Sequence, residues 1–268
     1  LMVNARKQLQ LTEKRFKDSH PHLVFDLGMR YGNPSIKNAL NNLRKQNCDK
    51  IIIFPLYPQY CAATTGSTFD AVAKEFLNWR WVPSLRFISN YHTNDQYINA
   101  LCNSIKEYWE KNSKPKKLIF SYHGVPNSHV DNVYPDSMCS DNDCETKITN
   151  DNKFCYKATV YETTKILASK LGLEPNQYIV TFQSRLTNKW LSPFTDDVLQ
   201  NLPKDGSKKV LVFSPAFTAD CLETIIEIGD EYKELFHEAG GDTLDYVPSL
   251  NYSDKWVDAI VDISNINE

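Results

Sequence analysis

The sequence predicts an α/β protein with two parallel sheets, each flanked by helices. Short β-branched apolar runs, typical of buried parallel strands, alternate with segments of helical periodicity. The alternation occurs in both halves, on either side of a polar, proline-containing stretch at 112–116. With 268 residues the chain suits one large or two modest domains. We therefore expect a first domain over 1–112, a second over 113–252, and a C-terminal helix over 253–268. One arrangement of this helix that fits is packing back on the first domain.

In the first half, the clearest element is the run Lys50-Ile-Ile-Ile-Phe-Pro-Leu-Tyr57, whose apolar, β-branched residues favour a buried strand. It leads into a hydroxyl-rich loop over 58–67. Proline near a first turn suits a helix beginning at Pro34, and Asn94 is a suitable cap for a later helix. In chain order we expect a helix over 1–17, strands over 22–28 and 50–57, a helix over 34–46 between them, a helix over 68–78, a strand over 84–88 and a helix up to about 110.

The second half repeats the alternation, with an irregular segment over 127–154 after its first strand. In chain order we expect a strand over 117–122, a helix over 156–171, a strand over 178–183, a helix near 195–202, a strand over 208–213, a helix from about 220, a strand near 244–247 and a closing helix from 253. Both halves therefore predict parallel sheets covered by helices.

The helix expected from Asp220 carries a line of acidic residues. At α-helical spacing, one face would hold Glu223, Glu227, Asp230 and Glu234. Glu223 also fits a capping box with Asp220, and Glu227 fits an ordinary solvated helix face. The location favours function, because α/β proteins bind ligands where a helix begins after a parallel strand.

Composition excludes several classes of protein. The net charge of -3 gives no global basic field for nucleic acid. We find no apolar run of the roughly 20 residues that span a bilayer, and no export leader. Seven scattered cysteines fit a reducing compartment, so we expect a cytoplasmic protein. The absence of dinucleotide and phosphate-loop motifs argues against a nucleotide enzyme.

His123 ends a predicted strand and is followed by Gly124, which allows close approach to the backbone. A lone histidine is more often a hydrogen-bonded structural residue than a ligand. However, if the strands run parallel, His123 and Glu223 open onto the same sheet edge. Such a pair can bind a divalent metal or move protons.

Several motifs resemble those of the ferrochelatase family, in the family's order and spacing. They are Met29-Arg-Tyr-Gly-Asn-Pro34, Pro55-Leu-Tyr-Pro-Gln-Tyr60, Thr64-Thr-Gly-Ser67, Phe120-Ser-Tyr-His-Gly-Val-Pro126, Thr181-Phe-Gln-Ser-Arg185, Trp190-Leu-Ser-Pro-Phe-Thr-Asp196, Ser214-Pro-Ala-Phe-Thr-Ala-Asp-Cys-Leu-Glu-Thr224, the pair Gly240-Gly241, and Pro248-Ser-Leu-Asn251. The resemblance covers nearly the whole chain. It implies two Rossmann-like, chelatase-type domains around a cleft, and a lyase that inserts ferrous iron into a porphyrin to make haem, with protoporphyrin IX preferred to coproporphyrin.

The resemblance also implies roles for particular residues. His123 would be the cleft histidine that contacts the metal or accepts a pyrrole proton, and Glu223 its carboxylate partner. A proton or metal path would include Glu227, Asp230 and His92. Residues lining the cleft or its mouth would be Arg30, Tyr31, Tyr57, Ser67 and Trp190. Insertion releases two pyrrole protons, so a base is needed beside the ring, with ligands weak enough to surrender the iron.

The chain departs from the family's pattern in two places. It opens inside a helix, so we expect the family's first strand and loop to be missing, which puts the activity of this chain in doubt. Some bacterial relatives carry a four-cysteine [2Fe–2S] site after the cleft histidine. Here only Cys139, Cys144 and Cys155 are present, and Glu145 and Val160 stand where further cysteines are expected. Because such a cluster normally takes four thiolates, the sequence favours a remnant without a cluster, and no cofactor beyond the substrate iron.

Two other functions fit the same motifs. One is a chelatase for cobalt or nickel, although such relatives tend to have more cleft histidines than His123 and His92. The other is a tetrapyrrole- or haem-binding protein without catalysis. The expected partners are a porphyrin and ferrous iron, with peripheral membrane contact also compatible. The sequence does not predict an oligomeric state.

Overall fold

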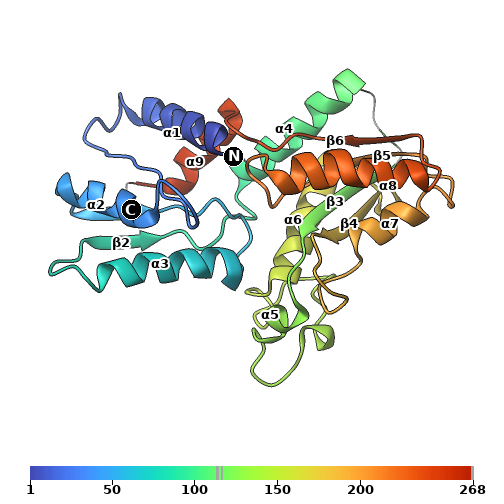
Figure 1. The fold of residues 1–268 in the computed structure, drawn as a ribbon, viewed down its shortest axis with the longest axis horizontal. Coiled ribbons are helices and arrows are strands. Elements are labelled where there is room, and N and C mark those ends of the chain that lie inside the picture. Colours follow the sequence, from blue (N-terminus) through green and yellow to red (C-terminus); the bar gives the residue numbers. More distant parts are fainter. Residues whose placement is uncertain (113–114, 116, 267–268) are drawn as a thin grey trace.

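The structure, a computed structural model that describes residues 1–112, 115 and 117–266, has an α/β fold with two parallel sheets (Figure 1). The α-helices are α1 (Met2–Phe16), α2 (Ile36–Lys45), α3 (Ser67–Phe76), α4 (Asp95–Asn112), α5 (Asn127–Asp131), α6 (Tyr156–Leu171), α7 (Thr195–Asn201), α8 (Lys233–Glu238) and α9 (Asp254–Ser264). The π-helical segments are η1 (Ala62–Gly66) and η4 (Glu223–Tyr232), and the 3₁₀ turns are η2 (Cys139–Asp141) and η3 (Pro175–Gln177). The strands are β1 (Lys50–Ile53), β2 (Ser84–Phe87), β3 (Lys117–His123), β4 (Tyr178–Gln183), β5 (Lys209–Phe213) and β6 (Thr243–Tyr246).

Both sheets are parallel throughout, as the alternation of strands and helices predicted. In the first half β1 pairs with β2, and in the second half the strand order is β4-β3-β5-β6. His123 at the end of β3 is in register with Gln183 at the end of β4. Because parallel strands finish at the same edge, the segments after β3, β4 and β5 open on one side of the larger sheet.

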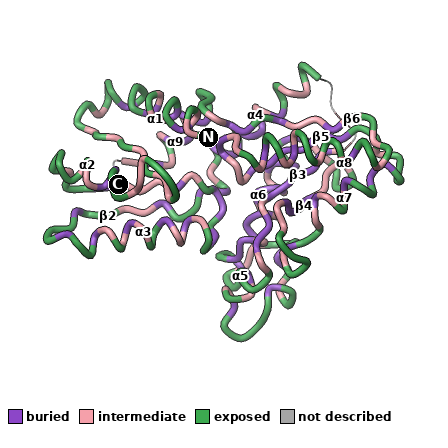
Figure 2. Tube along the Cα trace, in the orientation of Figure 1, coloured by how far each residue is buried: buried purple, intermediate pink, exposed green. Residues whose placement is uncertain are grey.

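The two halves share a continuous hydrophobic core. Tyr97 of α4, Phe120 of β3 and Trp256 of α9 are all fully buried members of one cluster. Figure 2 shows buried positions along the strands of the larger sheet and at the junction of the two halves. The closing helix α9 also lies against the first half, where Arg15 forms an ion pair with Asp258 at 2.8 Å.

The strand expected over 22–28 is wrong. These residues alternate in exposure as a strand would, but no strand of the described residues pairs with them, and only an isolated bridge joins Met29 to Ser35. An extended segment becomes a strand only when its backbone groups find a ladder partner. The strand expected over 50–57 ends at Ile53, close before Pro55, which has no N–H to continue a ladder.

Two further expectations are corrected. The irregular segment 127–154 contains the short helix α5 and the turn η2. The helix after β5 is π-helical over Glu223–Tyr232 rather than α-helical from Asp220. Asp220 does not cap it, because its carboxylate accepts hydrogen bonds from Tyr246, Ser249 and Asn251 further along the chain.

The expected boundary at 112–116 lies largely outside the described residues. None of the described helices combines the length and apolar character needed to cross a membrane.

Candidate active site at the carboxyl edge of the larger sheet

His123 is the last residue of β3, and the structure fixes its tautomer. The ring Nδ1 lies 2.6 Å from the carbonyl oxygen of Gly124. A carbonyl only accepts, so Nδ1 carries the proton and donates it. The remaining nitrogen, Nε2, is then the one with a lone pair for a proton or a metal. The strand end is held in place by the Tyr156 hydroxyl, which donates to the His123 carbonyl at 3.0 Å.

Two aromatic rings flank the His123 imidazole. Its centroid lies 6.3 Å from that of Trp190 and 6.3 Å from that of Phe217, both in tilted arrangements. Gly124 makes this packing possible, because a Cβ there would lie 3.0 Å from the Gln183 carbonyl oxygen and 3.3 Å from the Trp190 ring. The side chains around His123 thus form an apolar setting for a basic nitrogen.

Glu223 is brought to the same edge through Gln183. Glu223 is the first residue of η4, reached from the end of β5 by the segment 214–222. Gln183, the register partner of His123, donates from Nε2 to the Glu223 carbonyl oxygen at 2.9 Å. Its own carbonyl accepts the Gly124 N–H at 2.8 Å. His123 and Glu223, which are 100 positions apart, therefore both adjoin one buried glutamine.

Gln183 belongs to a polar network beneath the site. Its Oε1 accepts from the Ser121 hydroxyl at 2.8 Å and the Ser214 hydroxyl at 3.3 Å. Its Nε2 also donates to Glu227 at 3.1 Å. A buried side chain with all of its polar atoms bonded has one orientation, since any other would leave donors or acceptors unpaired.

Glu227 is held by four donors. Its carboxylate accepts the Ser184 backbone N–H at 2.7 Å, the Ser184 hydroxyl at 2.5 Å, the Tyr232 hydroxyl at 2.7 Å and the Gln183 amide at 3.1 Å. Ser184 has φ +61°, a conformation that non-glycine residues rarely adopt and that persists only where other contacts fix it. Glu227 therefore anchors η4 to the end of β4.

The π-helix changes which acids share a face. Its hydrogen bonds span five residues rather than four, so side chains four or five apart stack along it. This is seen in the bond from Tyr232 to Glu227, an i to i+5 pair. Asp230, three residues after Glu227, is therefore not grouped with it as it would be in an α-helix. Glu223, Glu227 and Glu231 are each four residues apart and follow one another along the π-helix. Asp230 is exposed, and its part in a path stays a prediction.

The sequence-predicted site residues of the first half of the chain lie close to one another. Arg30 donates from Nε to the Ser67 hydroxyl at 2.8 Å, and its guanidinium lies over the Tyr31 ring at 4.6 Å. Burial raises the pKa of Tyr57, and the electrostatic influence of Tyr31, Arg30, Cys221 and Glu223 also acts on this hydroxyl. Arg30, Tyr31 and Ser67 therefore lie together, and Tyr57 is near enough to Tyr31, Arg30 and Glu223 for their charges to act on its hydroxyl.

Beside Glu223 lies the thiol of Cys221. Burial, and then hydrogen bonding and repulsion from the Glu223 carboxylate, raise the pKa of Cys221 to about 12. The thiol therefore stays protonated at neutral pH and can donate toward Glu223. The loop before η4 is joined to the first half by the Thr218 hydroxyl, which donates to the Leu56 carbonyl at 3.3 Å.

His92 has a different setting from His123. It is buried, and its Nε2 pairs with the Glu162 carboxylate of α6 at 2.9 Å. Burial lowers its pKa below the ordinary value, although Glu162 acts in the opposite direction. Its Nδ1 is buried without a hydrogen-bond partner among the described residues. The predicted role of His92 in a metal path stays a prediction.

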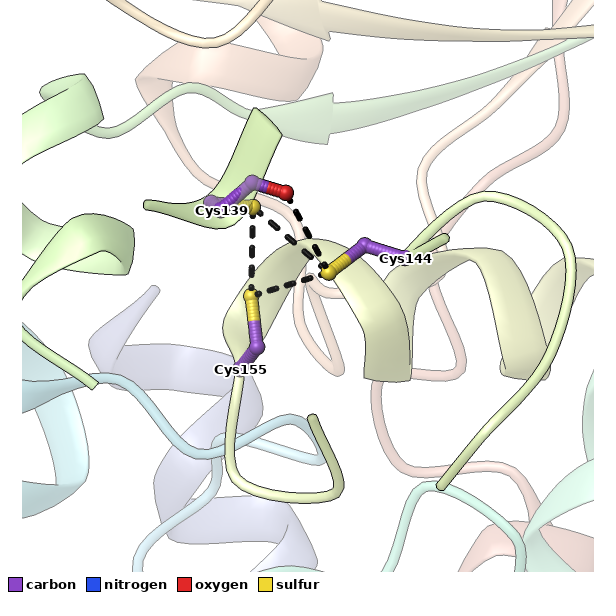
Figure 3. Close-up of side chains that lie close together, drawn as sticks. All are labelled: Cys139, Cys144 and Cys155. Atoms are coloured by element: carbon purple, nitrogen blue, oxygen red, sulfur yellow. Dashed lines mark hydrogen bonds between the residues drawn. The ribbon is translucent and has the colours of Figure 1, made fainter. Parts of the chain in front are cut away.

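The three cysteines of the segment after β3 converge, as Figure 3 shows. The Cys139 sulfur lies 3.6 Å from that of Cys144 and 3.6 Å from that of Cys155, and the last two are 3.8 Å apart. All three are buried. A [2Fe–2S] cluster is held by four thiolates, two on each iron. The cysteines supply only three thiolates, and all three sulfurs are as close together as ligands of a single metal atom would be. The residues present therefore do not fit that cluster.

Sequence reasoning missed Gln183, Phe217 and Tyr232. Gln183 and Phe217 lie within motifs that carried the resemblance, but a glutamine in a strand and a phenylalanine in a loop give no chemical signal of their own. Tyr232 could be paired with Glu227 only by knowing that the intervening helix is π-helical.

Comparisons with known proteins agree on the kind of protein this is. The ferrochelatase family model matches residues 1–267. A ferrochelatase of Hydrogenovibrio crunogenus is 42% identical over 264 residues, covering 98% of this chain and 65% of that protein. Ferrochelatase 2 of Shewanella oneidensis is 43% identical over 258 residues, covering 95% of this chain and 72% of that protein. The chain thus spans about two thirds of the length of these curated relatives.

Solved structures support the fold. SirB from Bacillus subtilis, determined with Fe³⁺, matches with a TM-score of 0.64 and 13% identity, covering 98% of this chain and 89% of that one. The sirohydrochlorin chelatase SirB from Bacillus subtilis subspecies spizizenii, in complex with cobalt, matches with a TM-score of 0.56 and 12% identity, covering 96% and 88%. At these identities the likeness concerns the fold alone.

Proposed function

Because this chain belongs to the ferrochelatase family, we propose that it inserts ferrous iron into a free-base porphyrin to form haem. The observation that supports the proposal is that Gln183, at the open edge of a parallel sheet, is the register partner of His123 and donates a hydrogen bond to the Glu223 backbone. An imidazole and a carboxylate suit a metal that must be bound and then released. They also supply the bases that the reaction needs.

His123 is the base in this proposal. Insertion of Fe²⁺ displaces two pyrrole protons, and a nearby nitrogen lone pair lowers the cost of removing them. The hydrogen bond from Nδ1 to Gly124 keeps that lone pair on Nε2. The same bond stabilises the imidazolium formed when Nε2 takes a proton, because Nδ1–H donates to a carbonyl dipole.

Glu223 delivers iron or relays protons. Its backbone is fixed by Gln183 while its side chain is only half-buried, so the carboxylate can reach both solvent and the cleft. Glu227 follows one turn along η4. Its carboxylate is held in place by hydrogen bonds from Ser184, Tyr232 and Gln183, which suits a fixed group along a path for Fe²⁺.

In this proposal the porphyrin binds between Trp190 and Phe217, which lie near His123, and Tyr57 and Tyr31 of the first half. We propose protoporphyrin IX rather than coproporphyrin as the substrate. Protoporphyrin carries two propionates and two apolar vinyl groups, whereas coproporphyrin carries four propionates. Among the cleft residues named above, Arg30 is the cation, and Leu222 and Ile226 expose apolar surface beside Glu223, a balance that favours the less charged ring.

We further propose a cytoplasmic location, with peripheral membrane contact compatible with the exposed apolar residues. All seven cysteines are free, which fits a reducing compartment.

The test is an anaerobic assay of metal insertion. The protein is mixed with protoporphyrin and ferrous iron, and loss of the free-base spectrum is followed against His123→Ala, Glu223→Gln and, as a matched control, the exposed histidine variant His129→Ala. We expect both site variants to lose at least about 100-fold in kcat, the scale of general acid–base catalysis, and His129→Ala to keep activity.

Three outcomes would count against the proposal. Porphyrin binding without metalation would indicate a carrier. Faster insertion of cobalt or nickel than of iron would indicate a different chelatase. Unchanged kcat in His123→Ala would remove the imidazole from the reaction.

A further inference from the structure

The triangle of Cys139, Cys144 and Cys155 lies outside the proposed active site, and its geometry fits a metal ion. We propose that it binds one thiophilic divalent ion, Zn²⁺, as a structural site. Cysteine thiolates are typical ligands of structural zinc, and Zn²⁺ has no redox chemistry of its own. The sequence favoured a remnant without a [2Fe–2S] cluster, and the spatial arrangement of the three sulfurs favours a single ion.

The sulfur spacing is the first argument. Zinc–sulfur bonds are about 2.3 Å, so two thiolates at a tetrahedral ion lie about 3.8 Å apart. The three sulfur–sulfur distances are 3.6, 3.6 and 3.8 Å, so a single point lies at bonding distance from all three. A planar three-coordinate ion would spread the same sulfurs further, to about 4.0 Å at the same bond length.

The fourth position is assigned to Tyr134. Its side chain is buried, and its hydroxyl oxygen lies 2.9 Å from the Cys144 sulfur. Glu145, the carboxylate next in sequence to Cys144, is exposed and forms an ion pair with Lys157 at 2.6 Å. The phenol oxygen is therefore the donor that the fold presents to the triangle.

The surrounding backbone holds the three cysteines before any ion binds. Cys155 is the N-cap of α6, where the positive end of the helix dipole favours a thiolate. The Cys139 N–H donates to the Asp131 carboxylate at 2.9 Å. Asn152, fully buried, donates to the Lys147 carbonyl at 2.9 Å and accepts the Thr149 N–H at 2.7 Å, which closes the loop before Cys155.

The position of the triangle suggests what the ion does. It joins the segment 127–154, which has little regular structure, to the start of α6. Tyr156, next to Cys155, donates its hydroxyl to the His123 carbonyl. An ion at the triangle would therefore stabilise the segment and the end of β3 together, without touching substrate.

The test measures metal content and ligand type. The protein is prepared anaerobically with zinc, passed through a chelating column, and examined by elemental analysis and zinc X-ray absorption. We expect one zinc per chain with three sulfur neighbours. Cys144→Ser should lose the ion, and Tyr134→Phe should keep three sulfur neighbours but bind zinc more weakly, because it removes the fourth donor.

Two controls separate this site from others. Cys102→Ser, which alters another buried cysteine, should keep the zinc. His123→Ala should also keep it, so loss of insertion activity and loss of zinc can be told apart. Because X-ray absorption is measured on the unaltered protein, a misfolded variant does not decide the result.

The proposal is overturned if the unaltered protein retains no zinc after the column, or if its zinc has fewer than three sulfur neighbours. It is equally overturned by two irons and two sulfides per chain with visible cluster absorption.

Discussion

At the scale of single residues, the candidate site depends on the orientation of Gln183. One amide group contacts the Glu223 backbone, the Glu227 carboxylate and two serine hydroxyls. Since the carbonyl end is occupied by two donors and the amide end by two acceptors, the side chain cannot be inverted without losing all four contacts.

Gln183→Leu should therefore weaken both stability and catalysis. Removing the amide leaves the buried Ser214 hydroxyl without its hydrogen-bond partner and takes one of the four donors from Glu227, at a cost of about 1–3 kcal/mol for a buried group left unpaired. We expect a lower unfolding midpoint in denaturant together with reduced kcat, because Glu223 loses its tether. Gln200→Leu, the same change at an exposed position of α7, should leave both unchanged. A normal kcat in Gln183→Leu would show that Glu223 is positioned by other contacts.

Asp220 predicts a dependence of stability on acid. Burial alone raises the pKa of this carboxyl, but hydrogen bonds from Asn251, Ser249 and Tyr246 outweigh it, so the pKa in the folded protein lies below the ordinary value. A carboxyl with a depressed pKa stabilises the fold above the unfolded value of about 3.9. That stabilisation is lost as the pH falls through the lower value of the folded state.

Asp220→Asn should make the unfolding free energy about 1–3 kcal/mol smaller at neutral pH, because the amide cannot accept from all the same donors. It should also make the fall in stability below about pH 4 shallower. Denaturant titrations at several pH values measure both effects, with the exposed Asp18→Asn as control. Parallel pH curves for Asp220→Asn and the unaltered protein would contradict this.

At the scale of elements, the turn from α8 to β6 fixes the edge strand of the larger sheet. Gly240 has φ +93° with open space around its α-carbon, whereas a Cβ on Gly241 would lie 2.2 Å from the ring of Phe236. Phe236 is fully buried within a cluster of packed apolar side chains, so a new Cβ would crowd it.

The two glycines should therefore respond differently to alanine. Gly240→Ala strains one residue at a cost of about 1 kcal/mol. Gly241→Ala overpacks the core, which typically costs about 1–3 kcal/mol and here meets a rigid ring, so we expect the upper end. Thermal unfolding should rank Gly241→Ala as clearly the less stable variant. The reverse order would mean that the turn relaxes away from Phe236.

At the scale of the whole molecule, α9 joins the halves. Trp256 is fully buried against Phe54 and Tyr91 of the first half, and it belongs to the same cluster as Phe120 of the larger sheet. The cluster that contains Trp256 therefore spans both halves, beside a separate cluster around Ile51 in the first half and another around Val212 in the second.

Trp256→Ala should lower the unfolding free energy by about 3–5 kcal/mol and leave a single transition. Spectroscopic probes in each half should report the same midpoint, whereas the exposed Trp81→Ala should shift neither. Separate transitions for the two halves would show that they unfold independently.

The sequence by itself determined the order of most elements and the parallel sheets, because strand and helix periodicity are local properties. The helix 156–171 and the strand 178–183 were predicted to the residue. It also indicated His123 and Glu223, since the chemistry of an imidazole and a carboxylate is visible in the residue type and its place after a strand.

Only the tertiary structure decided what pairs with what. The segment 22–28 has the sequence of a strand, but a strand also needs a neighbouring strand to pair with, and none of the described residues provides one. The π-helix is held by Glu227 bonding to the end of β4. Gln183 lies between His123 and the Glu223 backbone, and two cysteines of the irregular segment meet a third at the start of α6. Each of these depends on contacts between distant residues, and the pattern of a single stretch of chain does not contain them.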